Sequence, residues 1–452
     1  MLKKSLKYPK IALINTRNTD FFGYKLMLDQ EKIPYFIVDN IKSEFDVVIL
    51  PTGHNLILKP ILDYLKSGGS IISSFDFFAE DRGLSSIING TTNTFIPYGK
   101  GVLYYFNINF GEEILKSKFH SQSTSRNIPS QWLLYSVKHK IDNNKRKQRL
   151  YLKNILYRLV GPLTQIAYWP SPYESCFCQR IDADFPLTLF YKKNKIIDEL
   201  FNLIQEFKDI NFTIFLNHSF PTQIAKIKLL SSSYRNIELQ SHGCDDNIKH
   251  RDYCYSLASL GKDSIRDMLQ KSVVDSGFKI FAPPCEQINK DVLDCCKELN
   301  IQYLSAGGLA KDDIPRKCYY EETEYDIINI PTSEKEFLNE IDKNYYSNQF
   351  SDAINDHSLF CIYFHPAILL DKEPKKMISK FLYYDIIEKK KEGKLWNPFM
   401  GDLAKWWSMR NKSTIINGEL TFKDESTKEF FSTDNHNLSI IKWYPDRTQK
   451  LN

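Results

Sequence analysis

Residues 176–186 read Cys-Phe-Cys-Gln-Arg-Ile-Asp-Ala-Asp-Phe-Pro. The run Cys176–Ile181 is apolar and rich in β-forming residues, which is typical of a buried strand. Asp182 and Asp184 follow it directly, and side chains two residues apart in an extended chain point to the same side. The stretch therefore predicts a strand that ends in two carboxylates facing one way.

Six further apolar runs of this kind lie downstream, and most of the intervals between them are long enough for a helix, as in Lys195–Lys208. Regular alternation of strands and helices predicts a parallel sheet, arranged as a barrel or as a doubly wound sheet. The six runs are Phe212–Leu216, Ile237–Leu239, Phe278–Phe281, Ile301–Leu304, Ile327–Ile330 and Leu359–Phe364.

Polar side chains concentrate immediately after these strands. Besides the two aspartates, they include Asn217 and His218, His242, Ser305 and His365. In a parallel barrel the carboxyl ends of the strands converge on one opening, where active sites are built. We therefore expect carboxylates and imidazoles from distant parts of the chain to meet in one cleft.

Carboxylate and imidazole groups together favour metal-assisted hydrolysis. Zinc accepts both kinds of ligand and keeps a position for water, whose pKa it lowers from about 15.7 toward about 7. A carboxylate that does not bind the ion can take the proton from water, and a histidine can protonate a leaving amine. His242 and Asp246 are four residues apart, a spacing that suits a shared ligand set on a helical turn, and His250 is a further candidate.

The chain resembles the polysaccharide deacetylase family from about Tyr168 to Arg410. The matching segments are "RIDADFP" at 180–186, "ELQSHGCDDNIKH" at 238–250, "IFAPPCEQIN" at 280–289 and "CIYFHP" at 361–366. The resemblance implies a distorted (β/α)7 barrel that acts on an N-acetylated carbohydrate with a divalent metal ion. It implies that Asp182 is the general base, that His365 is the catalytic acid, and that Asp184, His242 and Asp246 hold the ion.

Two positions depart from the pattern of that family. Asp246 stands where the family has a second histidine, and a site with two carboxylates and one imidazole also suits a harder ion than zinc. Ala282 stands where the family has an arginine that tethers the catalytic base. These departures leave two alternatives open: a catalytically impaired barrel that binds carbohydrate or acts as a scaffold, and a hydrolase of another non-peptide C–N bond.

Residues 1–115 alternate short apolar runs with helix-compatible segments, which predicts a small α/β domain with a mostly parallel sheet. The phrases "FDVVILPTG" at 45–53, "LKSGGSIISS" at 65–74 and "GKGVLYYFNI" at 99–108 resemble the flavodoxin-like fold of class I glutamine amidotransferases. That family needs a nucleophilic cysteine, and the first cysteine of this chain is Cys176. A structural or docking role is therefore expected. The runs are Ile11–Ile14, Tyr35–Val38, Val47–Leu50, Ser70–Ser73 and Val102–Ile108.

The predicted organisation is an α/β domain at 1–115, a helical connector at 116–165, the barrel at 166–411 and a β appendage at 412–452. Within the appendage, Asn417-Gly418 is a hairpin-turn signal.

Composition narrows the functional class. The chain has 452 residues, of which 42% are hydrophobic, and a net charge of +5, too small an excess to indicate nucleic-acid binding. No apolar run approaches the roughly 18–20 residues of a membrane span. The basic start, Met1 to Lys4, precedes only the short run Ile11–Ile14, so no signal peptide is predicted and a cytoplasmic location is expected.

Overall fold

The computed structural model describes residues 9–53, 58–73, 93–106, 108–112, 144–184, 193–243, 261–284, 288–306, 313–320, 323–333, 343–366, 373–416, 419–433 and 438–445. The chain divides into two compact units. The described residues of the first unit fall within 9–112, 145–167 and 409–445, and the second unit contains residues 168–408. Among the described helices, none combines the length and the apolar character that crossing a membrane requires.

A six-stranded sheet forms the centre of the first unit, with the strand order β2-β1-β3-β4-β6-β5. Neighbouring strands are parallel except for β5, which runs antiparallel to β6. The strands are β1 (Ile11–Ile14), β2 (Phe36–Val38), β3 (Val47–Leu50), β4 (Ser70–Ser73), β5 (Thr94–Tyr98) and β6 (Gly101–Tyr105); the helices are α1 (Thr19–Glu31), α2 (Leu58–Ser67) and α6 (Asn144–Val160). The five predicted parallel strands are therefore present, whereas the antiparallel β5 was not anticipated.

The turn between α2 and β4 requires its two glycines. Gly68 has a φ of +112°, and a Cβ added at Gly69 would lie 2.1 Å from the Tyr64 ring. Glycine is the residue that adopts the first conformation readily and permits the second approach. The glycine pair therefore allows the chain to leave α2 at Ser67 and to enter β4 at Ser70.

The end of the first unit is only partly the β appendage that the sequence predicts. β17 (Ser413–Ile416) and β18 (Glu419–Phe422) form the expected antiparallel hairpin, whose turn residues 417–418 lie outside the described residues. α16 (Glu425–Thr433), a helix that was not predicted, follows the hairpin, and β19 (Ile440–Trp443) pairs antiparallel with β7 (Leu163–Ile166).

A buried ion cluster joins α1 to α6 within the first unit. Glu31 Oε1 accepts a hydrogen bond from Arg149 at 3.0 Å, and its Oε2 accepts one from Lys153 at 2.8 Å. The three side chains are almost completely buried, and burial, more than any neighbouring charge, lowers the pKa of Lys153 to about 8. The Glu31 carboxylate is thus the counter-charge of two buried cations.

Glu31→Gln is expected to destabilise the protein by about 3–5 kcal/mol, because removing one partner of a buried ion pair leaves uncompensated charge in the interior. Urea unfolding followed by circular dichroism measures the loss. Glu44→Gln is the control, because Glu44 pairs with Lys10 on the surface, where an ion pair contributes about 1 kcal/mol at most. Equal unfolding midpoints for the two variants would contradict the prediction.

The second unit is built on a 9-stranded sheet of described strands. Along it, β14, β12, β11, β10, β9, β8 and β15 are mutually parallel neighbours, β13 pairs antiparallel with β14, and β16 pairs with β8. The bounds are β8 (Ser175–Ala183), β9 (Phe212–Leu216), β10 (Ile237–Ser241), β11 (Ile280–Phe281), β12 (Tyr303–Ser305), β13 (Arg316–Tyr320), β14 (Thr323–Ile330), β15 (Leu359–Phe364) and β16 (Leu395–Trp396).

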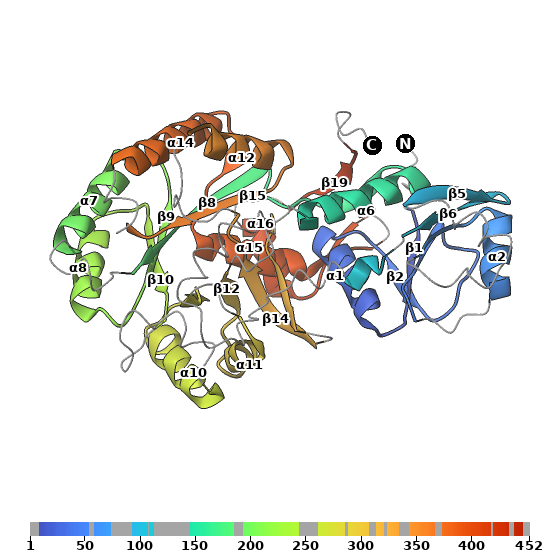
Figure 1. Cartoon of the computed structure of the whole chain (residues 1–452), viewed down its shortest axis with the longest axis horizontal. Helices are drawn as coiled ribbons and strands as arrows, with labels where there is room; N and C mark the ends of the chain where they lie inside the picture. The colour runs from blue at the N-terminus through green and yellow to red at the C-terminus, as the bar shows by residue number, and fades with distance from the viewer. Residues whose placement is uncertain are drawn as a thin grey trace. The chain divides into compact units, whose positions relative to one another are not determined.

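Helices lie between the parallel strands, as the sequence pattern predicts, and Figure 1 shows α7, α8, α10 and α14 along the outer side of the curved sheet. Several begin at recognisable signals: Asn289 caps α11 by accepting from the Val292 amide at 2.9 Å, and Pro221 occupies the first turn of α8. The helices are α7 (Lys193–Glu206), α8 (Pro221–Ser231), α10 (Lys262–Leu269), continued by the π-turn Gln270–Val274, α11 (Lys290–Glu298), α12 (Lys343–Asn355), α14 (Glu373–Lys391) and α15 (Met400–Asn411).

The two ends of the parallel array are joined by a loop rather than by a strand ladder. Ser333 donates its backbone N–H to Cys361 O at 2.7 Å, and the Ser333 hydroxyl oxygen accepts from the Cys361 amide at 2.9 Å. The Leu359 amide donates to Asp313 O at 2.7 Å. The segment that follows β14 therefore lies against β15 and closes a seam in the curled sheet.

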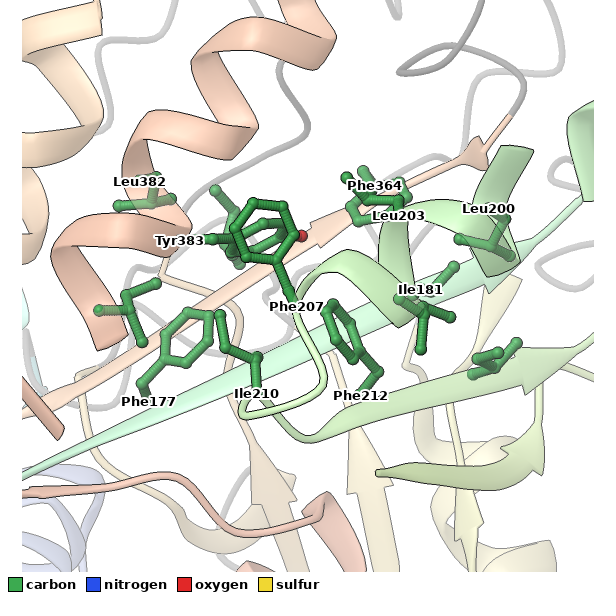
Figure 2. Packing of buried hydrophobic residues seen from close by; sticks show 14 of the residues in the cluster. Phe177, Ile181, Leu200, Leu203, Phe207, Ile210, Phe212, Phe364, Leu382 and Tyr383 are labelled. Carbon is green, nitrogen blue, oxygen red and sulfur yellow. The ribbon is translucent and has the colours of Figure 1, made fainter. Parts of the chain in front are cut away.

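A hydrophobic cluster between the sheet and its outer helices holds this unit together. Figure 2 shows Phe177 and Phe212 from the sheet, Phe207 after α7 and Tyr383 from α14 packed against one another. The aromatic rings of Phe207 and Tyr383 lie 4.9 Å apart. This packing fixes the outward face of β8, and with it the direction of the residues that alternate with that face.

Two tryptophans that could have served as sugar-stacking surfaces belong to the core instead. Trp406 and Trp407 on α15 are 1% and 0% exposed, and Trp406 Nε1 donates to Tyr168 O at 2.7 Å. They pack this helix, as aromatic residues at helical spacing usually do.

Candidate active site

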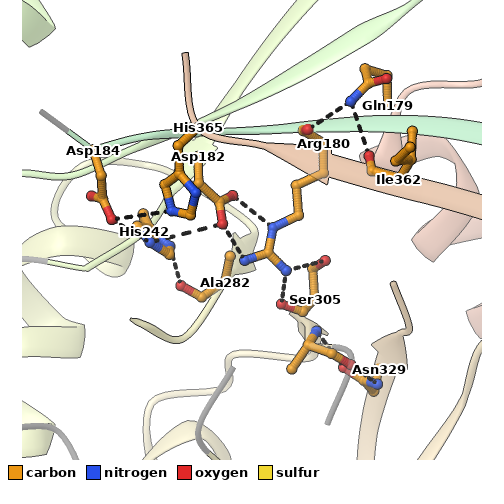
Figure 3. Close-up of polar contacts among 11 residues, drawn as sticks. Gln179, Arg180, Asp182, Asp184, His242, Ala282, Ser305, Asn329, Ile362 and His365 are labelled. Carbon is orange, nitrogen blue, oxygen red and sulfur yellow. Dashed lines mark hydrogen bonds and ion pairs between the residues drawn. The ribbon is translucent and has the colours of Figure 1, made fainter. Parts of the chain in front are cut away.

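Successive side chains of β8 point to opposite faces of the sheet, and this alternation directs three charged residues into the interior of the curved sheet. Phe177, Ile181 and Ala183 belong to the outer hydrophobic cluster, so Arg180 and Asp182 on the strand face the opposite side. Asp184, two residues on, lies with them in Figure 3. Arg180 is 1% exposed, Asp182 2% and Asp184 8%.

His242, just after β10, faces these carboxylates. Its Nδ1 lies 2.8 Å from the Ala282 carbonyl oxygen, an acceptor that makes Nδ1 the protonated donor and leaves Nε2 to face the site. Nε2 lies 3.3 Å from Asp184 Oδ2 and 4.0 Å from Asp182 Oδ2. Burial acts to lower the pKa of His242, but the charges of Asp184 and Asp182 outweigh it and raise that pKa above its ordinary value.

Asp184, which follows β8, contacts residues that follow three other strands, β9, β10 and β15. Its Oδ1 accepts from Asn217 Nδ2 at 2.6 Å, and its Oδ2 lies 3.7 Å from Nε2 of His365, the residue after β15. Burial acts to raise the pKa of Asp184, but His242, His365 and Asn217 hold it well below its usual range. Asp184 is therefore an ionised carboxylate with one oxygen directed at two imidazoles.

Asp182 is held by Arg180. Arg180 Nε donates to Asp182 Oδ1 and its Nη2 donates to Oδ2, both at 2.7 Å, while Nη1 donates to Ser305 O at 2.8 Å. Burial acts to raise the pKa of Asp182, but the Arg180 and His242 charges lower it below its ordinary value. This carboxylate is thus ionised and fixed in direction.

Asp184 and His242 have the separation expected of two ligands of one metal ion. Zinc ligands lie about 2.1 Å from the ion, so two tetrahedral ligand atoms are about 3.4 Å apart; Asp184 Oδ2 and His242 Nε2 are 3.3 Å apart. These two groups fit a shared ion. Within the described part of the chain no group of three or more His, Cys, Asp or Glu side chains is arranged to hold a metal.

Of the five predicted site residues, Asp182, Asp184, His242 and His365 lie together, as Figure 3 shows. The predicted ligand Asp246 and the spare candidate His250 lie outside the described residues. The individual roles assigned to these residues stay predictions. His218, by contrast, packs its ring against Phe278 with centroids 5.7 Å apart.

Arg180 was not predicted as a site residue from the sequence. A basic residue inside an otherwise apolar strand, two positions before Asp182 and in phase with it, was the available signal. Its other contacts come from residues far along the chain: Ser305 from β12, and the rings of Phe215 and Tyr363 at 5.4 and 5.1 Å from the guanidinium carbon.

No family model matches the sequence, and no curated protein matches it. Solved structures are similar to about half of the chain. A probable polysaccharide deacetylase from Pseudomonas aeruginosa PAO1 is 12% identical, with a TM-score of 0.41, over 53% of this chain and 93% of its own. Puue allantoinase is 13% identical, with a TM-score of 0.39, over 53% and 92%. A family 4 acetyl xylan esterase from Clostridium thermocellum, in complex with a cobalt ion, is 13% identical, with a TM-score of 0.31, over 51% and 91%. Similarity this low does not establish an activity for this chain.

Proposed function

We propose that this chain is a metal-dependent hydrolase that removes an N-acetyl group from an amino sugar or a glycoconjugate. One observation carries the proposal: two buried carboxylates and two imidazoles, delivered by β8, β10 and β15, gather around Asp184 Oδ2 and Asp182 Oδ2 at 3.3–4.0 Å. Hydrolysis of an amide with a metal ion uses ligands for the ion, a base for the attacking water and an acid for the leaving amine, and carboxylates and imidazoles can supply all three.

Asp184 and His242 would hold the ion, with Asp246 as the third proposed ligand. When bound, a divalent ion such as zinc polarises the acetyl carbonyl and acidifies the attacking water. Asn217 keeps one oxygen of Asp184 occupied, so that the other oxygen is directed toward His242. The Ala282 carbonyl keeps the His242 ring in the orientation that presents Nε2.

Asp182 and His365 divide the proton transfers between them. Asp182 is ionised and directed by Arg180, so it can accept the proton of the attacking water. His365 is 25% exposed on its side chain, the most accessible of the four groups, which suits a residue that must reach the departing amine and then exchange protons with solvent.

The first unit and the cellular location of the protein complete the proposal. The first unit is proposed to be a flavodoxin-like, amidotransferase-like domain. Its proposed role is structural or docking, because no cysteine that could act as the nucleophile precedes Cys176. A cytoplasmic location, also a proposal, would favour a small biosynthetic precursor over a finished polymer as substrate, and cell fractionation tests it.

The proposal is tested by incubating the purified protein with N-acetylglucosamine and its oligomers and measuring acetate by an enzyme-coupled assay. The ion content of the same sample is measured by plasma mass spectrometry. We expect acetate release, about one divalent ion per chain, and loss of both after dialysis against a chelator.

Other outcomes separate the alternatives. Ammonia rather than acetate from a panel of amides would indicate hydrolysis of a different C–N bond. A metal-free chain that binds the oligomers in calorimetry without turnover would indicate a binding module and would contradict the proposed activity.

A further inference from the structure

We infer that Arg180 is the residue that positions the Asp182 carboxylate for its proton transfer. The inference rests on the proposed function, since it concerns the base of that reaction. The Arg180 guanidinium directs its Nε and Nη2 to the two oxygens of Asp182, so it would act on the reaction through that carboxylate. It is therefore a positioning residue rather than a catalytic one.

The geometry between the two side chains is bidentate. Both donor–acceptor distances are 2.7 Å, one to each carboxylate oxygen, and both side chains are at most 2% exposed. A planar fork that engages both oxygens fixes the plane of the carboxylate as well as its position. Each oxygen keeps one lone pair, and Oδ2 is the oxygen that lies 4.0 Å from His242 Nε2.

The guanidinium is itself held on three sides. Its carbon lies 5.4 Å from the Phe215 ring of β9 and 5.1 Å from the Tyr363 ring of β15, so it sits between the two strands that flank β8. Its Nη1 donates to Ser305 O at the end of β12. Arginine, with its planar face and rigid fork, satisfies all of these contacts at once, whereas lysine offers one point charge.

The residue after Ser305, Ala306, is held by two hydrogen bonds to β14. Asn329 on β14 accepts from the Ala306 amide at 2.9 Å and donates to Ala306 O at 2.8 Å. Contacts thus extend from Asn329 to Ala306, and from the adjoining Ser305 through Arg180 to the Asp182 carboxylate. At position 282 there is only a methyl group, and the carbonyl oxygen of Ala282 is engaged by His242.

Arg180→Lys tests the inference by separating kcat from KM. We expect kcat for acetate release to fall about 10²-fold, as expected for a misplaced catalytic group, while KM changes less than about threefold and the ion content equals that of the unaltered chain. Arg266→Lys is the control, because Arg266 pairs with Glu298 on the surface of α10 and the same exchange there should leave kcat unchanged.

Two results would overturn the inference. If kcat of Arg180→Lys stays within about threefold of the unaltered chain, the bidentate contact is not needed for the reaction. If the bound ion is lost in parallel with kcat, Arg180 maintains the site as a whole rather than the base.

A second measurement tests whether Arg180 and Asp182 are coupled, and it does not depend on enzymatic activity. Urea midpoints are compared for Arg180→Met, Asp182→Asn and the double variant. Each single change leaves a buried charge unpaired, so the double variant should unfold at a higher urea concentration than either single variant. Additive losses would show that the two side chains are not coupled and would overturn the inference. If the unaltered chain releases no acetate, the proposed function fails, and these midpoints still decide whether Arg180 holds Asp182.

Discussion

Asp182→Asn is expected to keep its metal ion and to lose about 10²- to 10⁴-fold in kcat, the usual contribution of a general base. Asparagine has nearly the shape of aspartate but cannot accept the proton of the attacking water. Asp182 Oδ2 lies 4.0 Å from His242 Nε2, farther than the 3.3 Å of Asp184 Oδ2. Asp184 is therefore the carboxylate that we assign to the ion, and the ion should survive the exchange of Asp182.

The measurement is acetate release as a function of substrate concentration, with ion content determined on the same protein. Asp326→Asn is the matched control: Asp326 lies on β14 and pairs with Lys317, but its side chain is 85% exposed. It should change neither kcat nor ion content. Full activity in Asp182→Asn would refute the assignment of Asp182 as the base, and loss of the ion would move Asp182 into the ligand set.

His242→Ala is expected to lower affinity for the ion by more than about 100-fold and to bring acetate release to the level of the chelated protein. Even outer residues that orient a ligand change metal affinity by about 10- to 100-fold, so a ligand itself should contribute more. The measurements are ion content after gel filtration and competition with a coloured chelator.

His218→Ala is the control for this second prediction. His218 is also a histidine at the end of a neighbouring strand, but its ring packs on Phe278, and burial together with Lys228 and Lys271 lowers its pKa to about 4. We expect this variant to retain the ion. If His242→Ala binds the ion as well as the unaltered chain does, the proposed metal site is wrong; if His218→Ala loses the ion equally, the loss is not specific to a ligand.

The sequence was sufficient for features that are encoded locally. Strand positions follow from short apolar runs, and polar residues at strand ends stand out because they interrupt those runs. Asp182, Asp184, His242 and His365 could therefore be predicted to converge, and these four lie together in the site. Parallel topology does the rest, since it sends the ends of all these strands to one edge.

Features that depend on distant partners could not be predicted in the same way. A charged residue such as Arg180 is unexpected in a buried strand. Its position is explained only by its contacts with Ser305, Phe215 and Tyr363 in the folded chain. Likewise, β13 (RKCYY at 316–320) is too polar to be recognised as a strand before its pairing with β14 is known. In both cases a side chain or a backbone segment is stabilised by groups that no local pattern connects to it.

The seam between β14 and β15 has a consequence for local opening. β15 is bonded to β8 by a continuous parallel ladder from Leu359 to Phe364, whereas on its other side the described residues include loop contacts from Ser333 and from the carbonyl of Asp313. A loop contact opens locally more easily than a strand ladder, so the amide protons on that side should exchange with deuterium sooner than those of the β8–β9 pair. Because His365 follows β15 directly, local opening on this side would loosen the segment that carries His365, while Arg180 and Asp182 remain bonded between β9 and β15.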